Sequence, residues 1–550
     1  MTPRTLARLY PFVFSAVPAL AFFSTNRGHQ LLSSLLYPLL VSLAVAAVAT
    51  ALARAAARDP HAGAFKAFVL VGWFFAAGQI GELLPPEVWV FGYSVATSLP
   101  SQAALAATAL LLLRVDLGAQ GEKVTQALAL FSAVLAGMNL VSIALDSRPG
   151  TGRRPAAAAR PVRTLPSRLP PAASLPDVVV VVLDGYGRGD VLRETYGFDN
   201  SPFLDGLRRR GFFVASRALA NYPQTGLSLA SALNLDYIPA LLPDVRPRST
   251  SRTPLTDLIQ QNRVLDLLRA AGYRSTSFAN GYRIAELRSV DRFVTDGPSL
   301  DPFLRAFLAL TPLRALEPAA HQRPQGEVHR DAVRFALEHG AEPLAEQRPV
   351  LVFAHVICPH PPFVFRADGG VPDDAKLDRY LLHDGDHLKP DDPGRTEWYR
   401  RRYVEQVRFL NEGVLRLVDA VDATKGRPSA VLILGDHGPG SGLFWEDAAK
   451  TDLTERLGIL LACRLPGTGH RGLYDTITPV NAFRALLREA LAADLPPLPD
   501  RSYFATWKAP FVPLEVETAV DGSVRLVDDA RRRSAAAPVS LSSSPAPTSP

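Results

Sequence analysis

Two short motifs place acidic side chains at the ends of apolar runs. The run "VVVVVLDGYG" ends in Asp184, and "VLILGDHGPG" ends in Asp436 followed by His437. Apolar runs of this length are typical of strands that are buried on both faces of a sheet. In open α/β sheets, ligands bind beyond the carboxyl ends of the strands. Because carboxylate oxygens and an imidazole nitrogen suit Zn²⁺ or Mn²⁺, these three side chains are predicted to hold one divalent metal ion.

The stretch "NYPQTGLSLASALN" places Thr225 at the predicted start of a helix. Backbone N–H groups at a helix start stabilise a bound phosphate or sulfate, and a metal can activate a nearby hydroxyl. Thr225 is therefore predicted to be the nucleophile and a further metal ligand, and Gly226 favours it because glycine allows close approach of a ligand. One alternative is that Thr225 only caps the helix. Another is that Ser228, about one turn later, reaches the edge of the site and contacts the substrate.

Two histidines lie near a third predicted strand end, in "LVFAHVICPHPPFVF". His355 belongs to the apolar run, so it is either a substrate-binding residue or a hydrogen-bonded core histidine. His360 follows among prolines, which end regular structure. It is predicted to act in the site by orienting the anion of the substrate, donating a proton to the leaving group or binding a second metal.

Positioning these side chains requires an α/β fold with a mainly parallel central sheet flanked by helices. Five apolar runs are predicted as strands, at 177–184, 273–280, 349–356, 430–436 and 458–465. Helical patterns lie between them, at 200–211, 263–272 and 401–421. In the first two of these, a glycine follows the last apolar turn as a stop signal. The catalytic domain is predicted to span residues 177–510.

Residues 1–146 are dominated by Ala, Leu, Val and Phe and are predicted to form an all-α bundle of about five transmembrane helices. Apolar runs lie at 10–23, 31–52, 64–84, 88–113 and 124–145. Most approach the roughly 20 residues that cross a hydrocarbon core. The first run contains Pro11 and Pro18, and a cleaved signal peptide is the alternative for that run alone.

The distribution of basic residues predicts the orientation of this bundle. Arg4 and Arg8 precede the first run, and the connection after the second run is also basic, whereas 81–94 contains no Lys or Arg. By the positive-inside rule, the N-terminus is inside and, after an odd number of crossings, the catalytic domain is outside. Six arginines in 147–176 favour the opposite orientation. The sequence is therefore interpreted as a multi-pass protein of the inner or plasma membrane with an extracytoplasmic catalytic domain.

Two segments lack the patterns of folded structure. The Ala/Pro/Arg-rich linker at 147–176 is predicted to be an extended spacer that can also lie on anionic lipid headgroups. The C-terminal extension at 511–550 is predicted to be disordered from about residue 530. Much of the net charge of +6 comes from these segments, so no nucleic acid partner is predicted. The two cysteines, Cys358 and Cys463, are predicted to be buried thiols, with a disulfide as the alternative.

Five motifs occur in a fixed order between Asp177 and Tyr503: "VVVLDGYGR", "NYPQTGLSLAS", "HVICPHPPF", "YVEQVRFLNEGVLRLVD" and "ILGDHGPG". With them the domain resembles the alkaline phosphatase and sulfatase superfamily. More closely, it is similar to the membrane-anchored branch that contains lipoteichoic acid synthases and phosphoethanolamine transferases. The resemblance implies about five N-terminal spans and an extracytoplasmic alkaline phosphatase-like domain in the cell envelope.

The resemblance also implies roles for residues that match the motifs of this branch. Its threonine nucleophile is matched by Thr225, and its metal ligands are matched by Asp184, Asp436 and His437. The histidine pair of the transferases resembles His355 and His360. The chain departs from the family in three respects. It lacks the Cys/Ser-x-Pro-x-Arg signature of sulfatases, it has no further histidine soon after His437, and it has Asp184 where close relatives have glutamate.

These observations predict a membrane-anchored, metal-dependent phosphoester transferase or hydrolase. It would transfer or hydrolyse a lipid-derived phospho-headgroup through a phospho-threonine intermediate, with a phospholipid, a lipid-linked compound or an envelope polymer as substrate. Manganese or zinc is the favoured metal, with magnesium or calcium as alternatives. A sulfuric ester hydrolase is the alternative enzyme. A non-catalytic domain that binds a glycan or a lipid headgroup is the alternative of another class.

Overall fold

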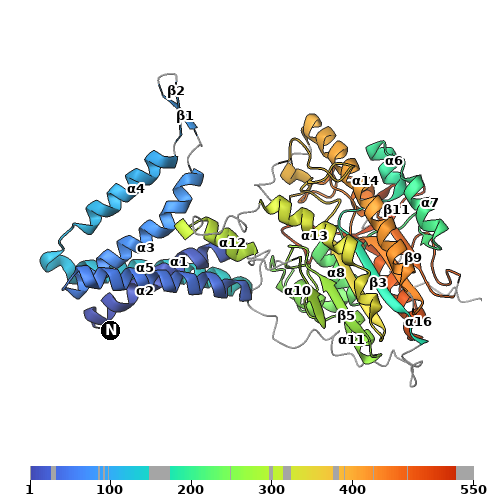
Figure 1. The fold of residues 1–550 in the computed structure, drawn as a ribbon, viewed down its shortest axis with the longest axis horizontal. Helices are drawn as coiled ribbons and strands as arrows, with labels where there is room; N and C mark the ends of the chain where they lie inside the picture. The colour runs from blue at the N-terminus through green and yellow to red at the C-terminus, as the bar shows by residue number, and fades with distance from the viewer. Residues whose placement is uncertain are drawn as a thin grey trace, which may run out of the picture.

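The computed structural model describes residues 2–26, 32–83, 87–90, 93–96, 98–147, 174–247, 249–296, 302–313, 324–375, 383–388, 391–424, 426–467 and 469–527. A helical N-terminal part and a larger α/β domain stand side by side along the long axis of the molecule (Figure 1). The predicted linker and the end of the C-terminal extension lie outside the described residues.

Five helices form the N-terminal part: α1 (Pro3–Asn26), α2 (Leu36–Ala56), α3 (Pro60–Leu83), α4 (Ser98–Leu113) and α5 (Gly121–Ser147). Among the described residues, four of these helices are long and apolar enough to cross a membrane, namely α1, α2, α3 and α5. The fourth predicted run is divided. Its first part forms an antiparallel hairpin of β1 (Glu87–Val90) and β2 (Tyr93–Ala96), and only the rest is helical. With 16 residues, α4 is about 24 Å long, which is short for a span.

The course of these helices nevertheless requires α4 to run back along the bundle. The ends of α1 and α5 that face the α/β domain carry Phe23 and Ile143, which belong to one apolar cluster with Phe75 of α3. Since α3 and α5 both run toward the α/β domain, α4 returns the chain between them (Figure 1). The N-terminus therefore lies at the end of α1 away from the α/β domain.

One short helix of the α/β domain packs on this bundle. Helix α12 (Pro302–Ala309) places Phe303 and Phe307 in the apolar cluster of the bundle. The ring centroid of Phe303 lies 4.8 Å from that of Phe22, and the centroid of Phe307 lies 6.0 Å from that of Phe75. Because both of these phenyl rings are buried in the cluster, α12 attaches the α/β domain to the membrane helices.

The α/β domain is built on a seven-stranded sheet with strand order β4-β9-β8-β3-β7-β5-β6. Its strands are β3 (Asp177–Leu183), β4 (Phe213–Val214), β5 (Arg274–Phe278), β6 (Arg292–Val294), β7 (Val350–Val356), β8 (Ser429–Gly435) and β9 (Leu461–Arg464). The strands β8, β3, β7, β5 and β6 are parallel, whereas β9 is antiparallel to both of its neighbours. The predicted α/β class with a mainly parallel sheet is confirmed.

Helices cover both faces of this sheet. One apolar cluster joins alternate residues of the central strands to α8 (Thr225–Leu233), α10 (Thr253–Gln260), α11 (Arg263–Ala270) and α16 (Pro479–Leu491). The other cluster joins the intervening residues to α6 (Gly189–Tyr196), α7 (Ser201–Arg209), α13 (Gln325–His339) and α14 (Pro393–Ala423). Shorter helices are α9 (Ile238–Leu241), η7 (Glu342–Ala345), η8 (Gly385–Leu388) and α15 (Leu453–Leu457).

The two cysteines belong to different faces of the sheet. Cys463 lies in the cluster with α8, and Cys358 lies in the cluster with α14. Both are free, buried thiols, and burial raises the pKa of Cys463 to about 12. The prediction of two buried thiols is therefore confirmed, and the disulfide alternative is wrong.

A second sheet lies near the C-terminal end of the domain. Strands β10 (Ser502–Phe504), β11 (Leu514–Thr518) and β12 (Val524–Leu526) pair in an antiparallel meander. The backbone N–H of Val524 donates to the Thr454 hydroxyl at 2.9 Å. The meander is thereby tied to α15, next to the loop that follows β8.

Candidate active site and metal centre

Three adjacent strands bring the predicted site residues to one edge of the sheet. Strand β3 lies between β7 and β8, and their register pairs Leu183 with Val356 on one side and with Gly435 on the other. Asp184 and Asp436 are the next residues along β3 and β8. His355 is paired with Val182 one residue earlier in β7. Side chains about 80 to 250 residues apart in the sequence therefore meet at the carboxyl ends of these strands.

Each of the two acids leaves one oxygen without a partner. Asp184 Oδ2 accepts a hydrogen bond from His355 Nε2 at 3.2 Å, and Asp436 Oδ1 accepts one from the Gly185 N–H at 3.1 Å. Among the described residues, Asp184 Oδ1 and Asp436 Oδ2 are fully buried and accept no hydrogen bond. A buried charged oxygen without a partner is costly, so this pair fits a bound divalent cation.

His437 presents a ring nitrogen to the same point. Its Nδ1 donates to the Gly438 carbonyl at 2.9 Å, which leaves the lone pair on Nε2. That Nε2 lies 3.5 Å from each of the partnerless oxygens, Asp184 Oδ1 and Asp436 Oδ2. Burial and the neighbouring Arg456 guanidinium lower the pKa of His437. The ring is thus held in the neutral form that binds metals.

Thr225 is the first residue of α8, and its hydroxyl points into this group. Its Oγ1 lies 3.2 Å from His437 Nε2 and 3.5 Å from Asp184 Oδ2. The helix is preceded by Gln224 as its N-cap, without a side-chain capping bond. The Thr225 hydroxyl therefore faces the carboxylate and the imidazole and does not cap α8.

Gly226 and Ser228 are placed differently from what the sequence suggests. A Cβ on Gly226 would make only an ordinary contact, 3.7 Å from Leu255 Cδ1, so no close approach requires glycine there. The Ser228 hydroxyl is buried and donates to the Asp436 carbonyl at 2.7 Å. Ser228 thus positions the backbone of Asp436, and its proton is already engaged.

His355 is held between an amide and a carboxylate. The Asn280 side-chain amide donates to His355 Nδ1 at 3.0 Å, so Nε2 carries the proton that is donated to Asp184. Burial opposes protonation of this ring, but the bond to Asp184 and the attraction of both carboxylates outweigh it and raise the pKa of His355. His355 is therefore a fixed donor that orients Asp184.

His360 lies beyond β7, and its ring is close enough to Asp184 and His437 to share an ion with them. Its backbone N–H donates to the Asp184 carbonyl at 3.0 Å, and its Nδ1 donates to the Pro361 carbonyl at 2.6 Å. Its Nε2 lies 3.8 Å from Asp384 Oδ2. Burial alone would raise the pKa of Asp184, but the attraction of His360 and the bond from His355 lower it, so Asp184 is ionised.

Two overlapping groups of described side chains are close enough to share an ion. One consists of Asp184, His360 and His437, and the other of Asp184, His355 and Asp436. Asp184 is common to both. The donor set has carboxylate oxygens and imidazole nitrogens, which suit zinc or manganese.

Two charged residues of the site have no recognisable motif. Arg456 and Asp384 are almost fully buried, and Arg456 Nη1 donates to Asp384 Oδ2. Arg456 also donates from Nε to the Pro223 carbonyl at 2.9 Å, and its Nη2 lies 3.4 Å from His437 Nε2. Although burial opposes ionisation, the attraction of Arg456 lowers the pKa of Asp384. This ion pair therefore lies against His437 and the residues that precede Thr225.

The turn after Asp184 depends on a glycine and a tyrosine. Gly185 has a positive φ of 74°, and a Cβ there would lie 3.5 Å from the Cβ of His360, so glycine is favoured for its backbone conformation. The buried Tyr403 hydroxyl donates to the Gly185 carbonyl at 2.8 Å and accepts from the Gly187 N–H at 2.9 Å. Helix α14 thereby fixes the loop that carries Asp184.

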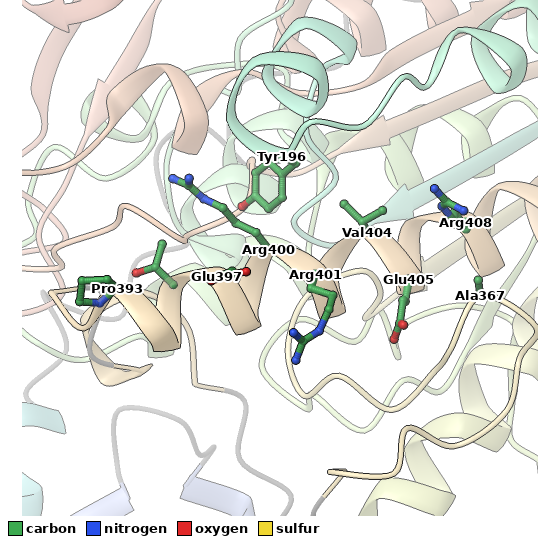
Figure 2. A pocket seen from close by; sticks show the side chains of 10 residues that line it. Tyr196, Ala367, Pro393, Glu397, Arg400, Arg401, Val404, Glu405 and Arg408 are labelled. Atoms are coloured by element: carbon green, nitrogen blue, oxygen red, sulfur yellow. The ribbon is translucent and has the colours of Figure 1, made fainter.

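A separate pocket of about 850 Å³ lies along the outer side of α14. Figure 2 shows Arg400, Arg401 and Arg408 along this helix, with Tyr196 above it. None of the predicted site residues lines this pocket. The predicted catalytic residues therefore lie at the strand ends and not in this pocket.

The chain matches the Sulfatase family model over residues 176–457, slightly more than half of its length. It belongs to the Sulfatase family and thus to the alkaline phosphatase and sulfatase superfamily. The predicted superfamily, the alkaline phosphatase-like fold and the assignment as an enzyme of this superfamily are confirmed.

Solved structures with a similar chain course include enzymes of several kinds. The C-terminal periplasmic domain of EcEptC from Escherichia coli is 12% identical, with a TM-score of 0.41, over 64% of this chain and 96% of that one. The same domain has been solved in complex with zinc. The phosphonate monoester hydrolase of Agrobacterium radiobacter is 15% identical, with a TM-score of 0.42, over 65% of this chain and 90% of that one.

A third similar structure is the soluble domain of lipooligosaccharide phosphoethanolamine transferase A from Neisseria meningitidis. It is 14% identical, with a TM-score of 0.39, over 62% of this chain and 97% of that one. No protein of the curated set matches this chain.

Proposed function

We propose that this protein is a membrane-anchored, metal-dependent enzyme that cleaves or transfers phosphoesters through a covalent phospho-Thr225 intermediate. The observation that carries the proposal is the placement of the Thr225 hydroxyl. It lies within 3.5 Å of Asp184 Oδ2 and His437 Nε2, beside two buried carboxylate oxygens without partners. A hydroxyl in this environment is better placed to take part in a reaction than to stabilise the fold.

Asp184, Asp436 and His437 would hold the metal together with the Thr225 oxygen. When bound, a divalent cation lowers the pKa of a hydroxyl and polarises the phosphoester. His355 keeps the Asp184 carboxylate in place, and Ser228 does the same for the backbone of Asp436. The start of α8 offers backbone N–H groups to the phosphate oxygens.

The chain itself provides the groups for both proton transfers. The bond from Thr225 Oγ1 to phosphorus forms while the bond from phosphorus to the leaving oxygen breaks. The proton of Thr225 passes toward Asp184 Oδ2, 3.5 Å away. His360 enters this step as the imidazolium: its Nδ1–H stays on the Pro361 carbonyl, and its Nε2 gives its proton to the leaving oxygen. Water or an acceptor alcohol then reverses these steps on the phospho-threonine.

A substrate at the membrane surface suits the arrangement of the two parts of the chain. Helix α12 attaches the catalytic domain to the apolar bundle through Phe303 and Phe307, which keeps this domain beside the membrane helices. The N-terminus, with Arg4 and Arg8, lies at the far end of the bundle (Figure 1). This supports an extracytoplasmic catalytic domain that acts on a lipid-derived phospho-headgroup.

Turnover of a phosphodiester by three forms of the full chain tests this proposal. We expect Thr225→Ala to abolish turnover while it retains bound metal, because two acids and one histidine remain. Thr225→Ser keeps a hydroxyl and should keep measurable turnover. Full metal-dependent activity of Thr225→Ala would refute the threonine mechanism.

Metal analysis and a sulfate ester separate the competing functions. A non-catalytic binding domain has no need of a cation, so a purified protein without stoichiometric metal and without turnover would favour that alternative. Faster hydrolysis of para-nitrophenyl sulfate than of the matching phosphoesters would favour the sulfuric ester hydrolase.

A further inference from the structure

Arg252 is a buried cation beside the proposed nucleophile that lacks an acidic partner. It is 6% exposed. Its Nη1 donates to the Thr250 carbonyl at 2.7 Å, and its Nη2 donates to the Trp507 carbonyl at 2.6 Å and to Gln224 Oε1 at 3.3 Å. All three acceptors are neutral. Within the described part of the chain, no carboxylate lies at ion-pair distance from this guanidinium.

The electrostatic surroundings of Arg252 leave its charge largely uncompensated. Burial lowers the pKa of Arg252 to about 10, with only partial opposition from Tyr282 and Glu446. Glu446 is exposed, and its Oε1 accepts a hydrogen bond from the Lys508 N–H at 3.1 Å. A buried cation with neutral partners favours binding of an anion.

Two buried arginines contact the two residues that precede Thr225. Arg456 donates to the Pro223 carbonyl at 2.9 Å, and Arg252 donates to the Gln224 side chain. Arg456 is neutralised by Asp384, whereas Arg252 has no such carboxylate. One positive charge next to the nucleophile is therefore available for a group that the protein does not supply.

An aromatic wall runs from one arginine to the other. The Arg252 Cζ lies 4.4 Å from the Trp507 ring centroid, and the Arg456 Cζ lies 5.1 Å from that of Trp445. The two tryptophan centroids are 5.1 Å apart. The exposed His387 ring lies at the edge of this wall, 6.0 Å from Trp445. Such walls reduce the local dielectric and strengthen an ionic contact.

We propose that Arg252, held in place by Gln224, forms a second anion subsite that binds a phosphate or carboxylate group of the substrate other than the phosphoester attacked by Thr225. The inference rests on the proposed function in taking Thr225 as the point of attack. It narrows the substrate to molecules with two anionic groups joined by a short connecting chain.

A second buried arginine offers a matched control. Arg484 also donates only to backbone carbonyls, those of Pro496 at 2.8 Å and Leu235 at 2.9 Å, and burial lowers its pKa. Arg484 lies on α16, and these two carbonyls belong to the segments that follow α16 and α8, not to the proposed site. Arg484→Gln therefore tests the general effect of removing a buried guanidinium.

The test compares the binding of two ligands to the metal-loaded full chain by titration calorimetry. Butylphosphonate has one anionic group, and butane diphosphonate has two on the same chain. We expect the wild-type protein to bind the diphosphonate about ten- to a hundredfold more tightly, as one charge-assisted contact provides. Arg252→Gln should reduce the ratio to the roughly twofold statistical value, whereas Arg484→Gln should retain it.

The outcomes separate the subsite from the proposed function. Equal binding of both ligands by the wild type, or an undiminished ratio in Arg252→Gln, would overturn the subsite. If Arg252→Gln does not fold, Arg252→Lys keeps a charge without the planar fork and should give an intermediate ratio; a wild-type ratio in it would also overturn the proposal. Turnover of bis(para-nitrophenyl) phosphate is measured alongside. A retained binding ratio without turnover would overturn the proposed function and support the subsite.

Discussion

Replacement of Asp436 by asparagine separates the metal site from the framework of the fold. Asp436 Oδ1 accepts the Gly185 N–H at 3.1 Å, while Oδ2 is buried without a partner among the described residues. An asparagine oxygen can keep the first bond, and its amide can replace the partnerless oxygen with a donor facing His437. The substitution thus removes a buried charge without removing volume.

The two metal states of this variant should change in opposite directions. A buried acceptor without a partner costs about 1 to 3 kcal/mol, so we expect metal-free Asp436→Asn to be about 2 kcal/mol more stable than the metal-free wild type. A ligand at a hundred times its Kd stabilises a protein by about 2.7 kcal/mol. The wild type should show a gain of this size with zinc or manganese, and the variant should show almost none.

Thermal unfolding of the full chain, with chelator and with metal, measures both effects. One kcal/mol corresponds to a shift in Tm of a few degrees for a domain of this size. Asp177→Asn is the matched control, at the far end of the neighbouring strand β3. Asp177 is also buried, accepts the Val350 N–H at 2.9 Å and pairs with Arg427. It should shift the Tm by the same amount in both states and leave the gain from metal intact. A less stable metal-free Asp436→Asn, or an undiminished gain from metal in it, would refute the reasoning.

Three further predictions concern the surroundings of the site. Arg456→Ala should destabilise the protein by about 3 to 5 kcal/mol, because it leaves the Asp384 charge buried and unpaired. Adding Asp384→Asn should restore part of this loss of stability. Additive effects of the two substitutions in denaturant unfolding would contradict the pairing. Burial and His360 lower the pKa of His329 from 6.5 to about 4, so the unfolded chain binds the proton first and the folded state should lose up to about 3 kcal/mol as the pH falls through this window. His329→Gln should flatten that part of the stability profile, and an unchanged slope would count against it. Phe307→Ala should lower the free energy of unfolding of the full chain by about 3 to 5 kcal/mol. The same substitution should have little effect on residues 174–527 alone, since the partners of this ring lie in the membrane bundle. Equal losses of Tm in the two proteins would argue against the contact.

The strand-end motifs were sufficient to predict which residues meet at the edge of the sheet. A run such as "VVVVVLD" predicts a buried strand. It also predicts where the final aspartate lies, because parallel neighbouring strands end at the same edge of the sheet. The direction of β9 could not be predicted, since a continuous apolar run is the same in either direction. The division of the run at 88–113 into a hairpin and α4 was also hidden, because apolar residues around Tyr93 suit strands as well as spans.

The rest of the site comes from residues whose role depends on tertiary contacts. Asp384 and Arg456 lie in segments without a motif, and their importance is visible only once each is seen to neutralise the other in a buried position. Arg252 and Tyr403 act through hydrogen bonds to residues far away in the sequence, such as Trp507 and Gly185. Helix α12 is too short for a clear period, and its apolar side chains have their partners in the other part of the chain.

The proposed mechanism requires Thr225 to become covalently attached to phosphorus during turnover. The direct test is rapid acid quenching of the metal-loaded full chain with a phosphodiester substrate, followed by mass spectrometry of the peptide containing residues 220–237. We expect a phosphorus-containing adduct on Thr225 that forms before the second product is released and is absent from Thr225→Ala. Steady turnover with no adduct on Thr225, or with the adduct on Ser228, would contradict it.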